Sequence, residues 1–391
     1  MRRRIAALTA VLLVACVGPA GAVEVEPGVE WTTIARDRGP VRINVLAVDP
    51  ARLRGVLSNE RIARRERVSA MGRRVAAVAG VNGGYFAPSG DPVGVLALDG
   101  ELLSEPVDGR SALVLPATAP GAAAPAPLVA PVRFRGHVTV NGRSREIDGI
   151  DRTRGLIPAC GGRGGDKPTT RPNAVLTCGD ASELVVLTPR YGVRPPREGG
   201  VEAVIRDGRV TRVRAPDSGP VPRDAVLLTG TGDAARFLRD VALPRSPAQI
   251  TMSVRADSRS VDLGATAVIV GGGPRLLRAG RVAVTAAAEG FRPPQAPFFF
   301  RSFVAGRQPR TLAGVRPDGT LLLVTVDGRL PGWSVGMTLP EAARLMRSLG
   351  ARDALNLDGG GSSTMAVRGE VVNRPADRVE RRVSDGLFVL P

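Results

Sequence analysis

A strand, a helix and a second strand follow one another in the C-terminal third, and this order restricts the fold more than any other feature. Leu321–Val326 (LLLVTV) is a continuous apolar run, typical of a strand buried on both faces. Thr338 and Glu341 have the spacing of a capping box, and apolar positions then recur on one helical face until Gly350. Asp353–Leu357 (DALNL) predicts the second strand. Such a unit joins parallel strands through a right-handed crossover.

An aspartate comes directly after each of these strands. Asp327 follows the first strand, and Asp358 follows the second and precedes three glycines and two serines. Because parallel strands end at the same edge of a sheet, both aspartates should lie where open α/β sheets bind ligands. One aspartate before a glycine would indicate only a turn. Two of them on one edge favour a functional site.

Two further apolar runs open onto glycines. Ala76–Val81 leads into Asn82–Phe86 (NGGYF), and Ala265–Val270 leads into Gly271–Pro274 (GGGP). Glycines at such positions let backbone N–H groups approach an anion, or they only permit a turn with positive φ. Four strand ends of this kind predict a shared anion-binding rim. No G-K-[ST] sequence follows them and G-x-S-x-G is absent, so neither a phosphate loop nor a nucleophile elbow is expected.

The composition excludes several kinds of site. His137 is the only histidine and there are three cysteines, too few for a histidine-cluster zinc site or for four thiolates on zinc or an iron–sulfur cluster. No acidic cluster has calcium-loop spacing, so we expect no metal and no cofactor, although a cation on Asp358 stays open. Among 391 residues, Gly 48, Pro 33 and only 3% aromatic residues favour short strands and tight turns. The predicted fold class is α/β to α+β, a strand-dominated mixed sheet with a C-terminal βαβ unit and a β-rich insertion.

The first 22 residues have the pattern of a secretory signal. Arg2–Arg4 precede the apolar run Ile5–Val17, and Ala20–Ala22 fits the small-residue cleavage rule. Residues 13–16 (LVAC) also look like a lipoprotein cleavage box, which would leave Cys16 acylated. Soluble export is the first interpretation and a lipid anchor at Cys16 the second. Because no later apolar run is long enough to span a bilayer, we expect a secreted or cell-envelope protein without a transmembrane segment.

Export also affects how the other two cysteines are interpreted. Cys160 and Cys178 enclose a polar, glycine-rich loop and lack the C-x-x-C spacing of a reactive thiol pair. Outside the cytosol, a disulfide is the default state of such a pair. We therefore predict a structural disulfide, which in the chain-entropy view stabilises the fold by about 3 kcal/mol.

The middle of the chain differs in composition from both ends. Ala117–Pro131 is rich in proline and alanine and lacks periodicity, as linkers do. Farther on, Glu202–Ile205 and Arg209–Val213 alternate in polarity around the turn Asp207-Gly208 and predict a β-hairpin. The predicted organisation is a signal peptide (1–22), an N-terminal part of the main domain (23–116), a linker with a β-rich inserted subdomain (117–260) and a C-terminal part of the main domain (261–391).

The chain is strongly basic. Its formal net charge is +17, falling by the three signal arginines to +14, and Lys167 is the only lysine. Codon usage that favours arginine would explain this composition. Either way, a basic exported surface concentrates near anionic envelope polymers and phosphorylated substrates. No aromatic stacking motif accompanies the charge, so nucleic acid is not an expected partner.

Read together, these segments resemble the phosphodiester glycosidase family. The similarity runs from about residue 75 to the C-terminus, except for roughly residues 117–260, and its most specific block is LNLDGGGSSTM. The similar blocks are Val81–Phe86, Gly271–Leu277, Pro309–Val315, Val324–Arg329, Trp333–Met346, Leu355–Met365 and Asn373–Asp377.

The resemblance implies hydrolysis of a sugar joined through its anomeric carbon to a phosphodiester. Such cleavage needs one group to stabilise the leaving oxygen and another to activate water or attack carbon. Asp327 and Asp358 are the candidates for base or nucleophile. Arg310 and Arg374 would clamp the phosphate, because a guanidinium matches phosphate geometry. The remaining expected substrate-binding residues are Asn82, Gly83, Thr311, Asn356, Gly360 and Ser363.

Each assignment has a structural alternative. In a chain this rich in arginine, a single arginine is more often a solvated surface group than a ligand. Asn82 and Asn356 would equally serve as turn residues that bond the backbone. Tyr85 and Phe86 fit a core position as well as a sugar platform.

The function also has an alternative, a non-catalytic module that binds anionic envelope glycopolymers. Two carboxylates beside a phosphate pocket would weaken such binding through repulsion. We therefore expect an exported hydrolase acting on a sugar-1-phosphodiester in an envelope glycopolymer, an exopolysaccharide or a glycolipid phosphate.

Overall fold

The structure is a computed structural model that describes residues 21–37, 39–118, 125–160, 167–168, 177–192, 199–216, 219–292 and 297–391. The predicted signal peptide up to residue 20, with the lipoprotein-like Cys16, lies outside the described residues, as do residues 119–124 of the predicted linker. In the described part of the chain, no helix is both long and apolar enough to cross a membrane.

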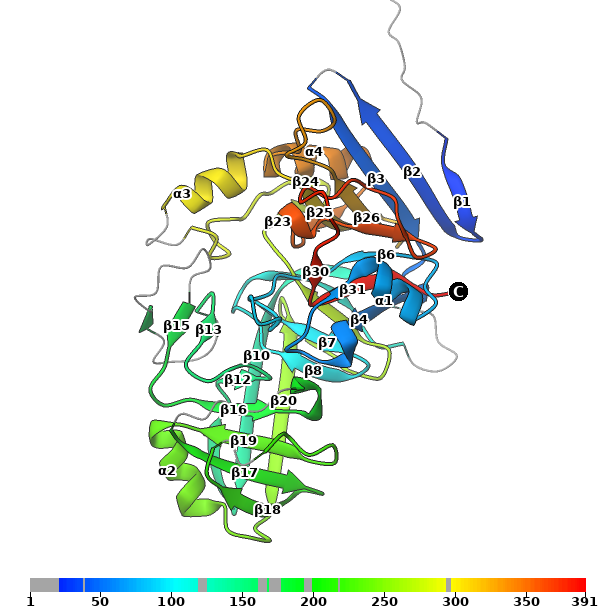
Figure 1. Ribbon diagram of the computed structural model, residues 1–391. Coiled ribbons are helices and arrows are strands. Elements are labelled where there is room, and N and C mark those ends of the chain that lie inside the picture. The colour runs from blue at the N-terminus through cyan, green and yellow to red at the C-terminus, as the bar shows by residue number, and fades with distance from the viewer. Residues whose placement is uncertain are drawn as a thin grey trace, which may run out of the picture.

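An eight-stranded sheet forms the upper part of the molecule in Figure 1, and every neighbouring pair in it is antiparallel. In spatial order its strands are β1 (Val23–Glu26), β2 (Val29–Arg36), β3 (Val41–Val48), β26 (Leu321–Val326), β25 (Arg310–Val315), β27 (Asp353–Asn356), β23 (Arg275–Arg278) and β24 (Arg281–Val282).

The predicted strand–helix–strand unit is present, but a third strand separates its two strands. β26 and β27 each run antiparallel to β25, so they are parallel to each other without being neighbours. Helix α4 (Leu339–Ser348) connects them and begins with the predicted capping box, in which the Glu341 N–H donates to the Thr338 hydroxyl oxygen. Its buried residues Ala342, Ala343 and Met346 pack on the outer face of this sheet. The two strands therefore end at the same edge, as predicted.

A second sheet carries the strand that precedes the NGGYF segment. In spatial order it contains β29 (Glu370–Val371), β28 (Met365–Val367), β6 (Ala79–Asn82), β31 (Asp385–Val389) and β4 (Leu53–Leu57). Helix α1 (Val68–Arg74) covers its outer face, where Met71 packs with Phe388.

A third sheet lies below these two in Figure 1 and includes the long strands β10 (Leu128–Val140) and β20 (Ala248–Ala256), which pair along nine residues. In spatial order its strands are β21 (Arg259–Val261), β20 (Ala248–Ala256), β10 (Leu128–Val140), β9 (Ser111–Leu115), β22 (Val268–Gly271), β7 (Leu96–Leu98) and β8 (Glu101–Ser104), with β11 (Arg143–Glu146) beside β10.

The predicted hairpin belongs to a smaller sheet at the bottom of Figure 1. Its two strands, β17 (Val201–Arg206) and β18 (Arg209–Arg214), pair around a turn in which Asp207 and Gly208 both have positive φ, as a tight hairpin turn requires. Helix α2 (Gly232–Val241) packs on this sheet. The strands are β12 (Gly149–Ile150), β16 (Leu184–Leu187), β19 (Val226–Gly230), β17 (Val201–Arg206) and β18 (Arg209–Arg214).

Short elements complete the fold. The predicted disulfide is present and joins Cys160 to Cys178 beside a small three-stranded sheet. That sheet consists of β13 (Ile157–Pro158), β15 (Thr177–Gly179) and β14 (Lys167–Pro168), and a two-stranded pair is formed by β5 (Glu66–Arg67) and β30 (Arg382–Val383). Helix α3 (Pro297–Phe300) continues into a π-helical turn, Arg301–Ala305, that contacts α4.

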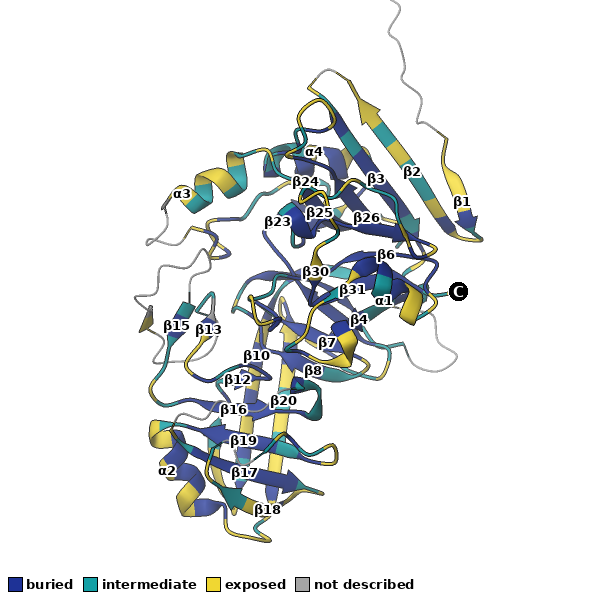
Figure 2. Ribbon diagram, viewed as in Figure 1, coloured by how far each residue is buried: buried dark blue, intermediate teal, exposed yellow. Residues whose placement is uncertain are grey.

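A large hydrophobic core lies where the three larger sheets face one another, as the buried strands in Figure 2 show. Leu323 of the first sheet, Val81 of the second and Leu113 of the third all belong to this one cluster. The molecule is thus a strand-dominated α+β protein, which confirms the predicted fold class. The boundaries of the predicted insertion stay a prediction.

Candidate active site

The ends of β6 and β27 are joined by the buried side chain of Asn82, the last residue of β6. Its Nδ2 donates to the carbonyl of Asp358 (2.8 Å), and its Oδ1 accepts from the Thr311 hydroxyl (2.7 Å) and the Thr364 N–H (3.1 Å). The Asp358 N–H donates to the carbonyl of Gly83 (3.2 Å). Asn82, Gly83 and Thr311 therefore lie together beside Asp358, with the Asn82 amide engaged by protein groups.

The glycines after β22 reach the same place through Tyr85. The Tyr85 hydroxyl donates to the carbonyl of Gly273 (2.7 Å) and accepts from Nδ2 of Asn356 (2.7 Å). The opposite atom of that amide, Oδ1 of Asn356, is buried and has no hydrogen-bond partner among the described residues. Asn356 therefore offers one unused buried acceptor at the end of β27.

The Tyr85 phenol is close to several charges. Burial raises the pKa of Tyr85 above its ordinary value, and the charge of Asp358 raises this pKa further. The positive charges of Arg110 and Arg310 act in the opposite direction. One carboxylate and two guanidinium groups therefore lie within electrostatic reach of one hydroxyl.

Asp358 is half-buried and is a suitable acid–base group. Desolvation raises the pKa of Asp358 to about 6, and the negative charge of Asp385 acts in the same direction. The Ser362 hydroxyl, the charge of Arg381 and the Gly359 N–H oppose this shift without cancelling it. A carboxyl group with this pKa exchanges protons readily near neutral pH.

Asp385, the first residue of β31, is a site carboxylate that the sequence reasoning missed. It is 2% exposed, its Oδ1 accepts from the Gly84 N–H (2.9 Å), and its Oδ2 accepts from the Ser384 hydroxyl. A Cβ atom on Gly83 would lie 1.9 Å from Asp385 Oδ1, so only glycine fits there. Asp327 and Asp358 follow strands, whereas Asp385 begins one, and its only signal in the sequence is the pair Asp385-Gly386.

The Asp327 carboxylate is held by protein groups. Its Oδ2 accepts from Nε1 of Trp333 (2.8 Å), its Oδ1 accepts from Nδ2 of Asn373 (3.0 Å), and both oxygens accept from the Arg374 N–H (3.1 Å each). Burial raises the pKa of Asp327, and these three donors oppose the shift. The Asn373 side chain also donates to the carbonyl of Ser363 (3.0 Å). Asp327 thus fastens the segment after β29 to the end of β26 and, through Asn373, to the glycine loop.

Arg310 is a buried cation in β25. The residue is 2% exposed. Its guanidinium donates to the carbonyls of Met337 (2.9 Å), Phe303 (2.7 Å) and Gly306 (3.1 Å). No carboxylate in the described part of the chain forms an ion pair with this guanidinium. Burial lowers the pKa of Arg310 to about 10, so it stays charged at neutral pH. A buried positive charge without a carboxylate favours an anionic ligand.

The glycine loop after Asp358 is surrounded by further arginines. Gly360 has φ +62°, and Nη2 of Arg329 lies 3.3 Å from the place where its Cβ would be. A Cβ atom on Gly361 would lie 2.2 Å from both Nη2 of Arg381 and Oδ2 of Asp377, which pair with each other at 2.6 Å. Arg329 and Arg381 were not among the sequence candidates.

Two other predicted residues border this loop. Arg374 is exposed, and its guanidinium lies 5.3 Å from the ring centre of Trp333, which Arg42 also approaches at 5.2 Å. The Ser363 hydroxyl is buried and has no hydrogen-bond partner among the residues that the structure describes. The structure thus brings all ten sequence candidates to one edge of the sheets. Asp327 and Arg374 are connected to the glycine loop indirectly, through the hydrogen bonds of Asn373.

The site shows no grouping of three or more His, Cys, Asp or Glu side chains able to hold a metal ion, within the ranges described. The side chains gathered at this site offer carboxyl, hydroxyl, amide and guanidinium groups. Together they can bind an anion and accept a proton next to it.

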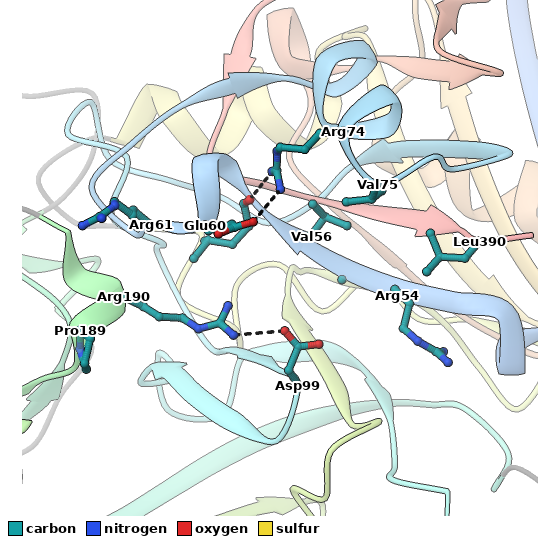
Figure 3. A pocket seen from close by; sticks show the side chains of 12 residues that line it. Arg54, Val56, Glu60, Arg61, Arg74, Val75, Asp99, Pro189, Arg190 and Leu390 are labelled. Atoms are coloured by element: carbon teal, nitrogen blue, oxygen red, sulfur yellow. Dashed lines mark hydrogen bonds and ion pairs between the residues drawn. The ribbon is translucent and has the colours of Figure 1, made fainter. Parts of the chain in front are cut away.

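A separate hollow of about 610 Å³ runs along the edge strand β4 and contains none of the candidate residues (Figure 3). Arg54, Arg74 and Arg190 line it, and two of them are paired, Arg74 with Glu60 at 3.6 Å and Arg190 with Asp99 at 3.3 Å. Its charges are thus partly neutralised. We place the site at the strand ends, where no described carboxylate neutralises the buried cation Arg310.

The fold and this site define a strand-rich α+β protein that presents a half-buried carboxyl group and a buried arginine around one tyrosine hydroxyl. Residues 199–390 match the phosphodiester glycosidase family model, so the chain carries a phosphodiester glycosidase domain over these residues. The match begins at residue 199, inside the segment 117–260 for which the sequence blocks showed no similarity.

Curated relatives match shorter stretches. The SPbeta prophage-derived uncharacterized protein YomE of Bacillus subtilis is 45% identical over 83 residues, which cover 21% of this chain and 13% of that protein. The N-acetylglucosamine-1-phosphodiester alpha-N-acetylglucosaminidase of Mus musculus is 35% identical over 81 residues, which cover 21% of this chain and 15% of the mouse protein. The matches thus span less than a fifth of these relatives.

Solved structures match over most of the chain. A Burkholderia pseudomallei K96243 protein that is described as exported superposes with a TM-score of 0.80 and 32% identity, covering 90% of this chain and 74% of that one. A hypothetical protein from Synechocystis shares the fold, with a TM-score of 0.71, 20% identity and coverage of 96% of this chain and 64% of that one.

Proposed function

We propose that this protein is an exported hydrolase that cleaves a sugar from a sugar-1-phosphodiester. One observation carries the proposal: the charges of Arg310 and Asp358 both act on a single hydroxyl, that of Tyr85. The Arg310 guanidinium is buried without a described carboxylate partner, and the Asp358 carboxyl group has a pKa of about 6. The phosphodiester glycosidase domain and the named activity of the mouse relative support the same reaction class.

In this proposal the phosphate binds at Arg310, with Arg329 and Arg374 at the solvent side of the glycine loop. Arg310 is held in place by backbone carbonyls, so its position is set before substrate arrives. The positive charges stabilise the negative charge that the leaving phosphate gains. Because a phosphomonoester is already a good leaving group, charge stabilisation replaces protonation by a strong acid.

The Asp358 carboxylate acts as the base in this proposal. It removes a proton from a water molecule while the water oxygen forms a bond to the anomeric carbon. The bond from that carbon to the phosphate oxygen breaks, and its electron pair stays on the phosphate. The products are a free sugar and a phosphomonoester, and the proton is held on Asp358 until solvent removes it.

The other residues orient the substrate or the loops. Oδ1 of Asn356 and the Ser363 hydroxyl are buried without partners among the described residues, so they can bind sugar hydroxyls. Asn82 and Asp327 are engaged by protein groups, and we assign them to positioning: Asn82 holds the Asp358 backbone, and Asp327 holds the segment of Arg374. Gly83 and Gly360 allow close packing of the loops.

Export is part of the proposal. The signal-like first 22 residues, the Cys160–Cys178 disulfide and the similarity to a protein described as exported support a secreted or cell-envelope location. A lipid anchor at Cys16 remains the second interpretation of the same segment.

The test is hydrolysis of a synthetic sugar-1-phosphodiester or a UDP-sugar by the purified mature protein. We expect free sugar and phosphomonoester to appear together, and we expect Asp358→Asn to lose this turnover. Asp353→Asn is the matched control, because Asp353 lies at the other end of β27 and binds the Ala279 N–H. Saturable, salt-sensitive binding of anionic glycans without turnover would instead establish a binding module.

A further inference from the structure

Phenylalanine is concentrated in one segment beside the site. The chain has 9 phenylalanines, and five of them lie between positions 291 and 303, inclusive. We call the described part of this segment, residues 297–305, the aromatic arm; it comprises α3 and the π-helical turn. In Figure 1 it projects from the body of the molecule next to α4.

A continuous stack of rings leads from the aromatic arm to the site. Phe299 stacks on Phe303 with 5.2 Å between ring centres, Phe303 stacks on Phe291 at 5.0 Å, and Phe291 meets Tyr85 at 5.8 Å. The outer end of the stack is open: Phe299 is half-buried, and its neighbour Phe298 is 82% exposed. A row of aromatic rings therefore leads from Tyr85 to solvent, and its open end is at Phe298 and Phe299.

The same arm holds the proposed phosphate ligand. The Arg310 guanidinium donates to the carbonyl of Phe303 and lies 5.4 Å from the centre of its ring. A phosphate bound to Arg310 would therefore lie next to the Phe303–Phe299 stack, and a substituent on that phosphate would follow the rings outward.

The chemistry of the arm selects the kind of substituent. Sugar hydroxyls usually bind to strong acceptor oxygens on aspartate, asparagine and glutamate side chains. Residues 291–309 contain none of these three residue types. Exposed phenylalanines gain instead from covering a hydrocarbon, and Arg301 on the arm adds positive charge beside it.

We infer that the phosphodiester hydrolysed here carries a hydrocarbon chain as its second ester, so that the substrate is a lipid-linked sugar-1-phosphate. This rests on the proposed function and selects the glycolipid phosphate among its three substrate classes. The phosphate lies at Arg310 and the first part of the chain lies along Phe303 and Phe299.

The test compares two phosphomonoesters, hexyl phosphate and methyl phosphate, which mimic the product with and without a chain. Wild-type protein should bind hexyl phosphate at least tenfold more tightly in calorimetric titration, because several CH₂ groups are removed from water. The double variant Phe298→Ser/Phe299→Ser should bring the two affinities within about twofold by weakening only hexyl phosphate. Phe298→Leu/Phe299→Leu keeps the apolar surface and should retain most of the difference.

Equal affinities of the wild-type protein for the two esters would overturn the inference. So would a double serine variant that weakens both esters equally, since the arm would then serve only to hold Arg310. Thermal unfolding of each variant accompanies the titrations. Hydrolysis of a sugar-1-phosphate methyl ester is measured separately, so failure of the proposed reaction and failure of the chain site give different results.

Discussion

At the scale of single residues, the site depends on charges that burial leaves only partly compensated. Arg310 is buried among backbone carbonyls, and Asp358 has Asp385 nearby as well as Arg381. Folding therefore places these groups where their charged forms are less stable than in water. Such groups gain from a ligand or a proton, which is the usual property of functional sites.

The pH dependence of turnover follows from the pKa of Asp358. Because the base must be ionised, kcat/KM should rise with pH and reach half its plateau near pH 6, the pKa of about 6 that burial gives Asp358. A profile that falls through the same range would show that the protonated form is active and would make Asp358 an acid. Initial rates from pH 4.5 to 8.5 measure this directly.

The same shift predicts the stability of Asp358→Asn. The pKa of Asp358 is higher in the folded protein than its ordinary value of 3.8, so its contribution to stability is lost as pH rises through about 6. At pH 8 the variant should therefore unfold at the same temperature as the wild type or slightly higher. Joint loss of activity and folding would make Asp358 structural.

Arg310 should determine how tightly the protein binds phosphate, even when no sugar is attached to it. Arg310→Met is expected to weaken binding of inorganic phosphate about tenfold or more, since one charge-assisted pair is lost. Arg278→Met, at an exposed position of the same sheet, is the control and should leave affinity unchanged. Unaltered phosphate binding in Arg310→Met, with folding intact in thermal unfolding, would assign Arg310 to the core.

At the scale of elements, the disulfide secures a part of the chain with little regular structure. β13, β14 and β15 have only two or three residues each, and Cys178 is buried at their centre. Few backbone hydrogen bonds hold such a sheet, so the covalent link supplies much of its order.

Cys160→Ser should therefore lower stability without lowering activity. We expect the free energy of unfolding to fall by about 3 kcal/mol under oxidising conditions, with kcat/KM unchanged because the bridge contains no candidate site residue. Urea unfolding with and without reductant measures the effect. Equal stability of wild type and variant in oxidant would mean that the bridge contributes nothing.

At the scale of the whole molecule, a buried ion triad joins the third sheet to the smaller sheet. Arg152 contacts Glu105 and Glu183 at 2.6 Å each, and all three side chains are buried. Glu105 follows β8, whereas Glu183 precedes β16, so the triad connects elements far apart in sequence. Removing the cation would leave the buried carboxylates of Glu105 and Glu183 without this ion pair.

Arg152→Ala should accordingly destabilise the protein by about 3–5 kcal/mol. Arg143→Ala, at an exposed position of β11, is the matched control and should change stability by less than about 0.5 kcal/mol. Denaturant unfolding of both variants provides the comparison. A small effect in Arg152→Ala would show that water replaces the guanidinium there.

Local features of the chain were predictable from sequence because each depends on neighbours a few residues away. The capping box at Thr338, the hairpin turn at Asp207-Gly208 and the strands before Asp327 and Asp358 follow from hydrogen-bond geometry and from side-chain periodicity. The common edge of Asp327 and Asp358 also followed, since a connecting helix returns the chain in the same direction.

Tertiary structure alone decided the rest, because the partners involved lie far apart in the chain. β25 lies between β26 and β27, Asp385 lies beside Gly83 across 302 positions of sequence, and Arg310 is buried by the aromatic arm. No local pattern encodes which strand ends meet or which arginine loses its water. The sequence by itself thus determined the strands, the turns and the residue types at their ends, whereas long-range packing determined which of those residues became a site.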